Sequence, residues 1–236
     1  MRYFSLARRV PETSAFEPKA LTQLYRLISQ VPLVRTAHRR FVAGALDQGV
    51  VKGCALDLGM GPGIVTAQIA RLRPGLQMVG VDLAAHMVEL AAHQVASTGR
   101  NGRELWLQGD GHHLPFASGS LDLVVSSFAL HHWDDPLRVL NEIARVLAPG
   151  GRYFIADVCR QANTFQRFFA YASVPAISLP FGSYWGYGGY YESVRAGYTP
   201  DEAQNLLDRS ALPRGQVEIE STWFVPILTM ASKETE

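Results

Sequence analysis

The stretch Leu56–Gly63, LDLGMGPG, places three glycines at alternate positions after an acidic residue, Asp57. Such a loop lets the backbone pass close to a ligand, because glycine has no Cβ. It is not a P-loop, since no lysine follows it. A dinucleotide fingerprint is incomplete as well, because Ile64 occupies the place of its third small residue. Asp57 would repel a pyrophosphate and attract a ligand that carries an ammonium or sulfonium group.

Two more acidic residues follow apolar runs that are typical of strands. Asp82 follows QMVGV, and Asp110 follows ELWLQG. Ligands of open α/β sheets bind at the carboxyl ends of the strands, near the switch in strand order. Each aspartate alone is equally well explained as a helix N-cap or turn residue. Three of them in register with the glycine loop favour one shared ligand site.

The rest of the segment 55–157 shows the rhythm of βαβ units. Short apolar runs alternate with helical patterns, and this spacing predicts a parallel sheet. Asp135 followed by Pro136 marks the start of one helix, as an N-cap with proline at the first helical position. Helices of this kind would connect parallel strands, and the three aspartates would then lie together at one edge of the sheet.

Five motifs in this order resemble the class I S-adenosylmethionine-dependent methyltransferases. DLGMGPG looks like their D-x-G-x-G-x-G loop, VGVDLAAHMV their second-strand motif and QGDGHHLPF their third-strand motif. LDLVVSSFALHHWDDP and LNEIARVLAPGGRYFIADV resemble the fourth-strand motif and the lead-in to strand five. The resemblance covers about residues 50–160. It implies S-adenosylmethionine as cofactor and S-adenosylhomocysteine as product.

The resemblance also assigns roles to single residues. Asp82 would grip the ribose diol and Asp110 would meet the adenine amino group. Ala84 stands where relatives often carry serine, which is expected to cost one hydrogen bond near the cofactor. The cofactor-binding residues that it implies are Asp57, Gly59, Gly61, Gly63, Asp82, Leu83, Met87, Asp110, Gly111, His112 and Ser127.

Two histidines, His131 and His132, follow the fourth-strand motif on the side where the methyl group should point. Methyl transfer to a hydroxyl needs a base, and histidine suits this role with its pKa of about 6.5. In sugar and natural-product O-methyltransferases with this LHH pattern, the first histidine is the base and an aspartate after strand five orients it. The resemblance therefore implies His131 and Asp157 as the catalytic pair, with His132 beside the acceptor. The alternative is that His131 packs near the sulfonium and positioning supplies most of the rate.

An aromatic segment follows at residues 165–198. It holds 11 of the chain's 24 aromatic residues among interleaved glycines, without helical periodicity, which favours a binding loop over a packed helix. In the family this region commonly forms a lid, and aromatic side chains there can bury a flat or lipid-like acceptor. The alternative is that half of them belong to the core. The candidate acceptor contacts are Phe169, Tyr184, Trp185, Tyr187, Tyr190 and Tyr191.

We therefore expect an α/β fold, with a doubly wound, Rossmann-like sheet of seven mostly parallel strands. Residues 1–50 would form an N-terminal helical cap and 51–160 the S-adenosylmethionine-binding core. Residues 161–212 would form the acceptor-binding lid and a helix, and 213–236 a C-terminal edge hairpin of the same sheet. Pro226 suits an edge or bulge position better than a central strand.

The composition limits the partners. The net charge is only +1, which gives no support for nucleic-acid binding. No apolar run reaches the roughly 18 residues of a membrane span, and no signal peptide is evident. Two cysteines in strand-like runs, and no Cys/His group with zinc spacing, indicate free thiols in a reducing cytoplasm and no metal site. One basic cluster is expected on a solvated helix face: Arg35, His38, Arg39 and Arg40.

The predicted function is methyl transfer to a small, largely apolar or aromatic acceptor at a hydroxyl oxygen. Nitrogen and carbon remain open as the methylated atom, and the oligomeric state is not specified. A non-catalytic protein that binds S-adenosylmethionine for a partner is one alternative. A nicotinamide-dependent oxidoreductase is another, against which Asp57, Ile64 and the lack of a catalytic Tyr-x-x-x-Lys argue.

Overall fold

The computed structural model describes Arg9 and residues 32–97, 104–169, 172, 189–221 and 226–233. The strands are β1 (Lys52–Leu58), β2 (Gly75–Asp82), β3 (Leu105–Gln108), β4 (Leu121–Ser127), β5 (Leu147–Val158), β6 (Gly215–Ser221) and β7 (Pro226–Ser232). The helices are α2 (Pro32–Leu46), α3 (Ile64–Leu72), α4 (Ala85–Ser97), α5 (Pro136–Val146), α7 (Gly189–Ala196) and α8 (Pro200–Arg209), with a short 3-10 helix η2 (Leu130–His132).

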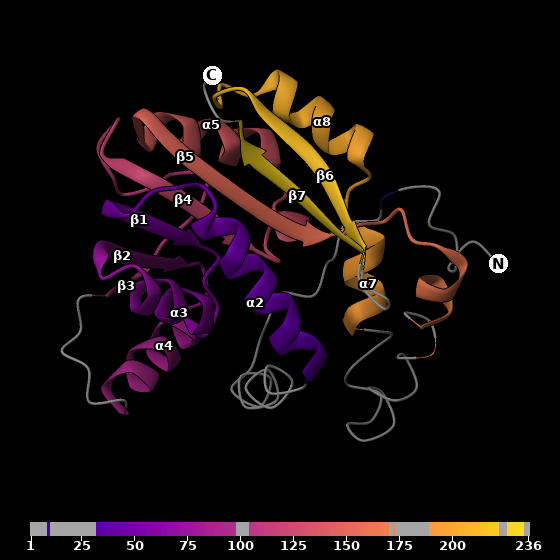
Figure 1. Cartoon of the computed structure of the whole chain (residues 1–236), viewed down its shortest axis with the longest axis horizontal. Helices are drawn as coiled ribbons and strands as arrows, with labels where there is room; N and C mark the ends of the chain where they lie inside the picture. The colour runs from indigo at the N-terminus through magenta and orange to yellow at the C-terminus, as the bar shows by residue number, and fades with distance from the viewer. Residues whose placement is uncertain are drawn as a thin grey trace.

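The seven strands form one sheet in the order β3-β2-β1-β4-β5-β7-β6 (Figure 1). Strands β1 to β5 pair in parallel, and β7 runs antiparallel to both β5 and β6. The switch in strand order lies between β1 and β4, because the chain runs outward from β1 to β3 and then returns to the other side. The predicted doubly wound, mostly parallel sheet is confirmed.

The C-terminal hairpin corrects one expectation, because its second strand is not at the sheet edge. β7 lies between β5 and β6, so Pro226 begins an inner strand. The sheet tolerates this proline because it is the first residue of the strand, where no ladder hydrogen bond is lost inside the strand. Its carbonyl oxygen accepts a hydrogen bond of 2.8 Å from the backbone N–H of Cys159.

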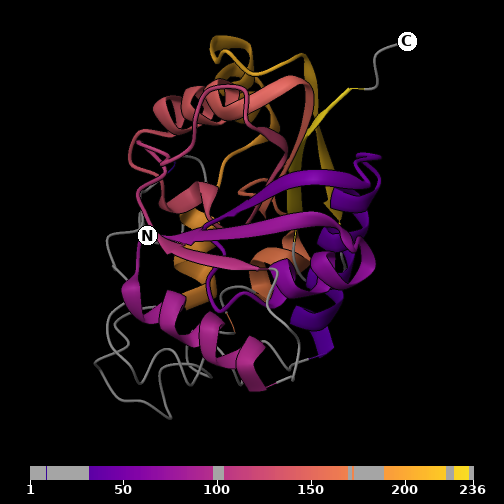
Figure 2. The ribbon, with the colours of Figure 1, turned by 90° about the vertical axis from the view of Figure 1, so that its left-hand side faces the viewer.

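Apolar side chains cover both faces of the sheet. On one face, α5 buries residues at helical spacing, Val139, Leu140, Ile143 and Val146, in one cluster with side chains of α8. On the other face, α2 and α3 pack against the inner strands around Phe41. Figure 2 shows α2 and α3 on one side of the sheet and α5 on the other. Loops, rather than these two layers of helices, lie at the carboxyl ends of β1, β2 and β4.

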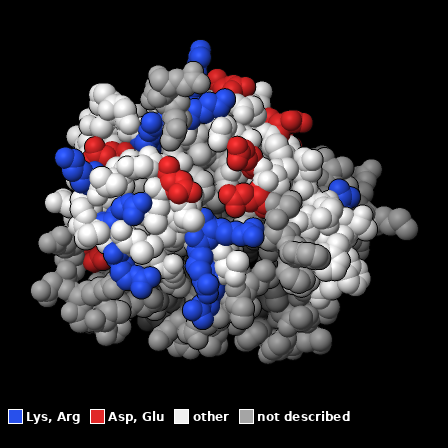
Figure 3. All heavy atoms as spheres, viewed as in Figure 1, with Lys and Arg blue, Asp and Glu red and all other residues white. Residues whose placement is uncertain are grey.

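Helix α2 is the described part of the predicted N-terminal cap. Its residues Arg35, Arg39 and Arg40 are exposed. Figure 3 shows basic side chains in the middle of the face on which α2 lies in Figure 1, with acidic side chains beside them. His38 does not belong to this solvated face, which corrects the expectation: it is buried, and burial lowers its pKa. No helix among the described residues is long and apolar enough to cross a bilayer.

The end of the predicted lid is a packed helix. Tyr191 is only 3% exposed, and Val194 and Ala196 of α7 are buried with it. In α7, the alternative that some of these aromatic residues belong to the core is therefore correct, because one face of the helix packs against the protein interior. Residues 173–188, with Tyr184, Trp185 and Tyr187, lie outside the described residues, as does the side chain of Tyr190.

Candidate active site

The glycine loop joins β1 to α3 and turns sharply at Gly59, Gly61 and Gly63, which all have positive φ angles. A Cβ on Gly59 would lie 2.5 Å from the Cβ of Ala129, so a larger residue would collide with the turn after β4. A Cβ on Gly61 would meet no atom within 4 Å. The loop is therefore packed on one side and open at Gly61, where a ligand can reach the backbone.

Asp82, the last residue of β2, fastens this loop. Its Oδ2 accepts a hydrogen bond of 2.8 Å from Gly61 N–H, and its Oδ1 accepts one of 2.9 Å from Ala84 N–H. Burial raises the pKa of Asp82, and the two N–H donors oppose that shift. Next to it, Leu83 is 71% exposed at the strand end, while Met87 is buried at the start of α4. The ribose contact of Asp82 stays a prediction, which the remaining lone pairs of the carboxylate allow.

Asp57 lies deeper than its sequence position indicated. Its carboxyl group is fully buried, and Oδ2 accepts a hydrogen bond of 2.6 Å from Thr66 Oγ1. In the described part of the chain, Oδ1 has no hydrogen-bond partner. Burial raises the pKa of Asp57 to about 7, against the opposing hydrogen bond from Thr66. Asp57 is thus a buried group with a raised pKa, and a nearby cation would favour its charged form.

Asp110 follows β3 by two residues and is paired with a histidine. Its Oδ1 accepts hydrogen bonds from His112 N–H at 2.9 Å and from His112 Nδ1 at 2.7 Å, and the backbone bond is the main reason that its pKa is lowered. His112 Nε2 lies 2.8 Å from Asp134 Oδ1. The His112 side chain therefore joins Asp110 to the segment after η2. Gly111 lies between them, and Ser127 is the last residue of β4, which is separated from β3 in the sheet order by β2 and β1.

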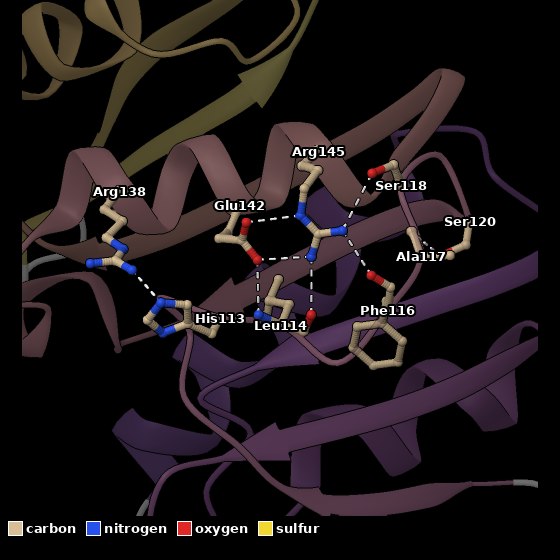
Figure 4. Close-up of polar contacts among 9 residues, drawn as sticks. All are labelled: His113, Leu114, Phe116, Ala117, Ser118, Ser120, Arg138, Glu142 and Arg145. Carbon is tan, nitrogen blue, oxygen red and sulfur yellow. Dashed lines mark hydrogen bonds and ion pairs between the residues drawn. The ribbon is translucent and has the colours of Figure 1, made fainter.

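The segment after Asp110 is tied to α5 by a network that the motifs did not indicate. Figure 4 shows Glu142 and Arg145 pointing from α5 toward this segment. The Glu142 carboxylate accepts a hydrogen bond from Leu114 N–H at 2.9 Å, and Arg145 donates to the carbonyls of Phe116 at 2.8 Å and Leu114 at 3.0 Å. Glu142 and Arg145 also pair with each other at 2.8 Å. Their E-x-x-R spacing is the one sequence signal for this contact.

His131 and Asp157 are brought together as expected. Both side chains are buried, with 3% and 1% exposed. Asp157 Oδ1 lies 2.6 Å from His131 Nδ1, and Oδ2 accepts a hydrogen bond of 2.6 Å from the His131 backbone N–H. An ionised carboxylate only accepts hydrogen bonds, so Nδ1 carries the proton and Nε2 keeps the lone pair that a base needs. Asp157 lies within the end of β5 rather than after it, which is a small correction.

The turn between β4 and His131 is strained. Phe128 has a φ of 54°, a left-handed conformation that bulky residues rarely adopt. Its N–H donates a hydrogen bond of 2.8 Å to Ala156 O, which anchors the turn on β5. Such strain gathers at functional sites, where the surrounding structure holds it in place. The sequence carried no signal for this conformation, because a phenylalanine is an unusual choice for it.

His132 lies beside His131, with ring centroids 4.0 Å apart, and part of its surface is exposed. Desolvation of the ring, followed by the charge of His131, lowers the pKa of His132 to about 4. Of the other candidate acceptor contacts, Phe169 is half-buried in a helical turn that follows β5, and Tyr191 is packed in the interior.

The family described as "Methyltransferase domain" matches residues 56–155. The match begins on β1 and ends in β5, so it includes the glycine loop, Asp82, Asp110 and the turn that carries His131. Residues 56–155 therefore resemble a class I methyltransferase domain, whose cofactor is S-adenosylmethionine, and this match goes against the nicotinamide alternative.

Named relatives and solved structures agree with this methyltransferase domain. The ubiquinone/menaquinone biosynthesis C-methyltransferase UbiE of Desulfotalea psychrophila is 35% identical over 144 residues, which are 59% of this chain and 56% of the relative. The O-methyltransferase rstn1 of Aspergillus nomiae is 35% identical over 127 residues, 52% of this chain and 56% of the relative. The chain thus spans about half the length of these curated relatives.

A crystal structure of a putative S-adenosylmethionine-dependent methyltransferase from Methanococcus maripaludis shares the fold. Its TM-score is 0.65 at 22% identity, over 95% of this chain and 99% of that chain. The residues of the methyltransferase domain fit the cofactor on their own chemistry. The open side of Gly61 allows a close approach, and the unpartnered buried oxygen of Asp57 suits a positively charged ligand.

Proposed function

We propose that this chain transfers the methyl group of S-adenosylmethionine to a hydroxyl oxygen of a small aromatic or largely apolar acceptor. The observation that carries the proposal is the buried pair of His131 and Asp157, whose 2.6 Å contact fixes the imidazole with its proton on Nδ1. His131 lies on the turn after β4, and Ala129 of this turn would lie 2.5 Å from a Cβ built on Gly59 of the glycine loop. A base is thus held next to the loop that is open for the cofactor.

The residues of the site supply orientation and a place for one proton. S-adenosylmethionine, when bound, supplies an electrophilic methyl group on a positively charged sulfur. His131 Nε2 takes the hydroxyl proton as the acceptor oxygen attacks, and the Asp157 carboxylate stabilises the imidazolium that results. Asp82 keeps the glycine loop in shape through its bond to Gly61 N–H. Proximity of the two reactants provides the rest of the rate.

Methylation of a ring carbon is a second candidate. It is favoured by the relative from Desulfotalea psychrophila, which is named a ubiquinone/menaquinone biosynthesis C-methyltransferase. The same base would serve a quinol acceptor, because removal of a phenolic proton raises the electron density of the neighbouring ring carbons. The two candidates therefore share His131 and differ in the atom of the acceptor that is methylated.

The test is a panel of phenols, catechols and reduced quinones, incubated with S-adenosylmethionine that carries a labelled methyl group. Mass spectrometry and NMR of the product locate the label on oxygen or on carbon. His131→Ala should lower turnover by about 10²–10⁴-fold, the usual reach of a general base. Its affinity for S-adenosylmethionine should stay within about twofold of the wild type, since a change below ~0.4 kcal/mol means no lost contact.

His113→Ala is the matched control, because His113 is an exposed histidine whose contact is with Arg138 on α5 (Figure 4). It should leave turnover nearly unchanged. A His131→Ala enzyme that keeps more than about a third of wild-type turnover would contradict the base role, since that loss is under ~1 kcal/mol of barrier. Cofactor binding without transfer to any acceptor would favour the non-catalytic alternative.

A further inference from the structure

Arg9 reaches the active-site turn from far away in the sequence. Its Nη2 donates a hydrogen bond of 3.0 Å to the backbone carbonyl of His131, and its Nε donates one of 2.7 Å to the carbonyl of Ala196. The guanidinium carbon lies 4.4 Å from the centroid of the Tyr198 ring, within the range of a cation–π contact. One half-buried side chain thus joins the turn η2 to the end of α7.

The contact completes a three-point hold on His131. Asp157 accepts hydrogen bonds from the backbone N–H and from Nδ1 of His131. Arg9 donates to the third polar group, the backbone carbonyl. The donor has to come from outside η2, because the last carbonyls of a helix have no N–H partner within the helix and η2 is only three residues long.

The other end of the contact is rigid. Ala196 and Tyr198 are buried, and Arg160 holds the residue between them through a hydrogen bond of 3.1 Å to Gly197 O. Arg160 also pairs with Glu202 at the start of α8. A planar guanidinium with several fixed donors suits such a double carbonyl contact better than an ammonium group does. Arg9 therefore ties the catalytic turn to a fixed point of the fold.

We propose that Arg9 is a positioning residue for His131, which it holds by its backbone carbonyl in the orientation that the base step requires. The catalytic consequence rests on the proposed function, whereas the hold on the turn does not. Without Arg9, the two bonds to Asp157 remain, but the peptide between His131 and His132 loses its charged donor. The turn then opens more often while the sheet beneath it stays closed.

Native-state hydrogen exchange of the apo protein tests the hold without any acceptor. The amide of His131 is buried and bonded to Asp157, so it should exchange slowly in the wild type. In Arg9→Ala it should exchange about 10- to 100-fold faster, the effect of losing a hydrogen bond to a charged group. The amides of Val124 and Val125 in β4 should keep their wild-type rates. Arg9→Lys should lie between the two, because it keeps the charge and one bond.

Arg145→Ala is the matched control. Arg145 also donates to two backbone carbonyls, those of Leu114 and Phe116, but it holds a different segment (Figure 4). It should leave the exchange of the His131 amide unchanged. An unchanged His131 amide in Arg9→Ala would overturn the proposal. Equal acceleration at His131, Val124 and Val125 would overturn it as well, because it would show only a loss of global stability.

A double-mutant cycle tests the catalytic consequence. Arg9→Ala should lower kcat by about 10-fold with KM for S-adenosylmethionine unchanged, and it should add no loss in the His131→Ala background. A full additional loss in that background would overturn the link to His131. If His131→Ala itself leaves turnover intact, the proposed base role fails, and the exchange rates alone decide whether Arg9 holds the turn.

Discussion

Replacement of Asp157 by asparagine is the sharpest test of how His131 is held. Three N–H groups converge on this carboxylate at 2.6 Å: His131 N–H on Oδ2, and His131 Nδ1 and Val158 N–H on Oδ1. An asparagine keeps the shape of the side chain but replaces one oxygen with an NH2 group. In either orientation, the new NH2 group faces an N–H group that donated to the carboxylate in the wild type.

Both orientations harm the base. If the NH2 group faces the His131 backbone N–H, two donors meet in a buried place, which costs about 1–3 kcal/mol and pushes η2 away from β5. If it faces Nδ1, that nitrogen must accept, so the proton moves to Nε2 and the lone pair there is lost. The corresponding change in a Ser-His-Asp triad lowers kcat by about 10⁴. We expect a loss of about 10²–10⁴-fold in Asp157→Asn.

Single-turnover measurements over pH 5–9 give the decisive assay. If His131 is the base, the wild-type rate should rise with pH, since only the neutral imidazole accepts a proton. Desolvation lowers the pKa of His132 to about 4, below this range. In Asp157→Asn the rise should vanish while calorimetry shows wild-type affinity for S-adenosylmethionine. An asparagine variant with an unchanged pH profile and more than about a third of the rate would refute the reasoning.

Two further predictions concern the acids of the cofactor side. Asp82→Ala removes the acceptor of Gly61 N–H and the expected ribose contact, so calorimetry should show binding of S-adenosylmethionine weakened by about 1–3 kcal/mol; unchanged affinity would exclude Asp82 from the site. The pKa of Asp57 is raised to about 7 in the folded state. Between about pH 4 and pH 7 the folded state therefore keeps a proton that the unfolded state has lost. The contribution of Asp57 to the free energy of unfolding falls as the pH rises through this range. Urea unfolding should therefore show that the free energy of unfolding of Asp57→Asn, relative to that of the wild type, rises by about 1.4 kcal/mol per pH unit between pH 5 and 6.5. A difference that stays constant with pH would mean that Asp57 is ionised throughout.

The sequence was sufficient for the parts of the site that are local in the chain. The glycine loop, Asp82 and Asp110 each stand directly after a strand, and a parallel sheet brings such positions to one edge whatever else the chain does. The pair of His131 and Asp157 was also predictable, because β4 and β5 are neighbours in the sheet. Their pairing depends on the strand order, which the motifs indicated.

Other features depend on packing that no local pattern encodes. His38 follows the helical spacing of three exposed arginines, yet α2 turns it toward the sheet. Pro226 was expected at an edge or bulge position, but β7 lies between β5 and β6, where all of its residues are buried. Arg9 meets His131 over a separation of 122 residues, and a single arginine near the start of a chain carries no signal of its partner.

The place of β7 has a consequence for the order in which the protein can be built during translation. Asp157 lies opposite Leu228 in the antiparallel pair of β5 and β7. Until the ribosome has made the segment Pro226–Ser232, β5 has paired with β4 alone and exposes a row of unpaired N–H and C=O groups along its other side. A nascent chain that holds the whole methyltransferase domain, residues 56–155, thus still carries an open sheet edge where other chains can add. The strand that carries Asp157 gains its second neighbour only from residues that are made long after the domain itself.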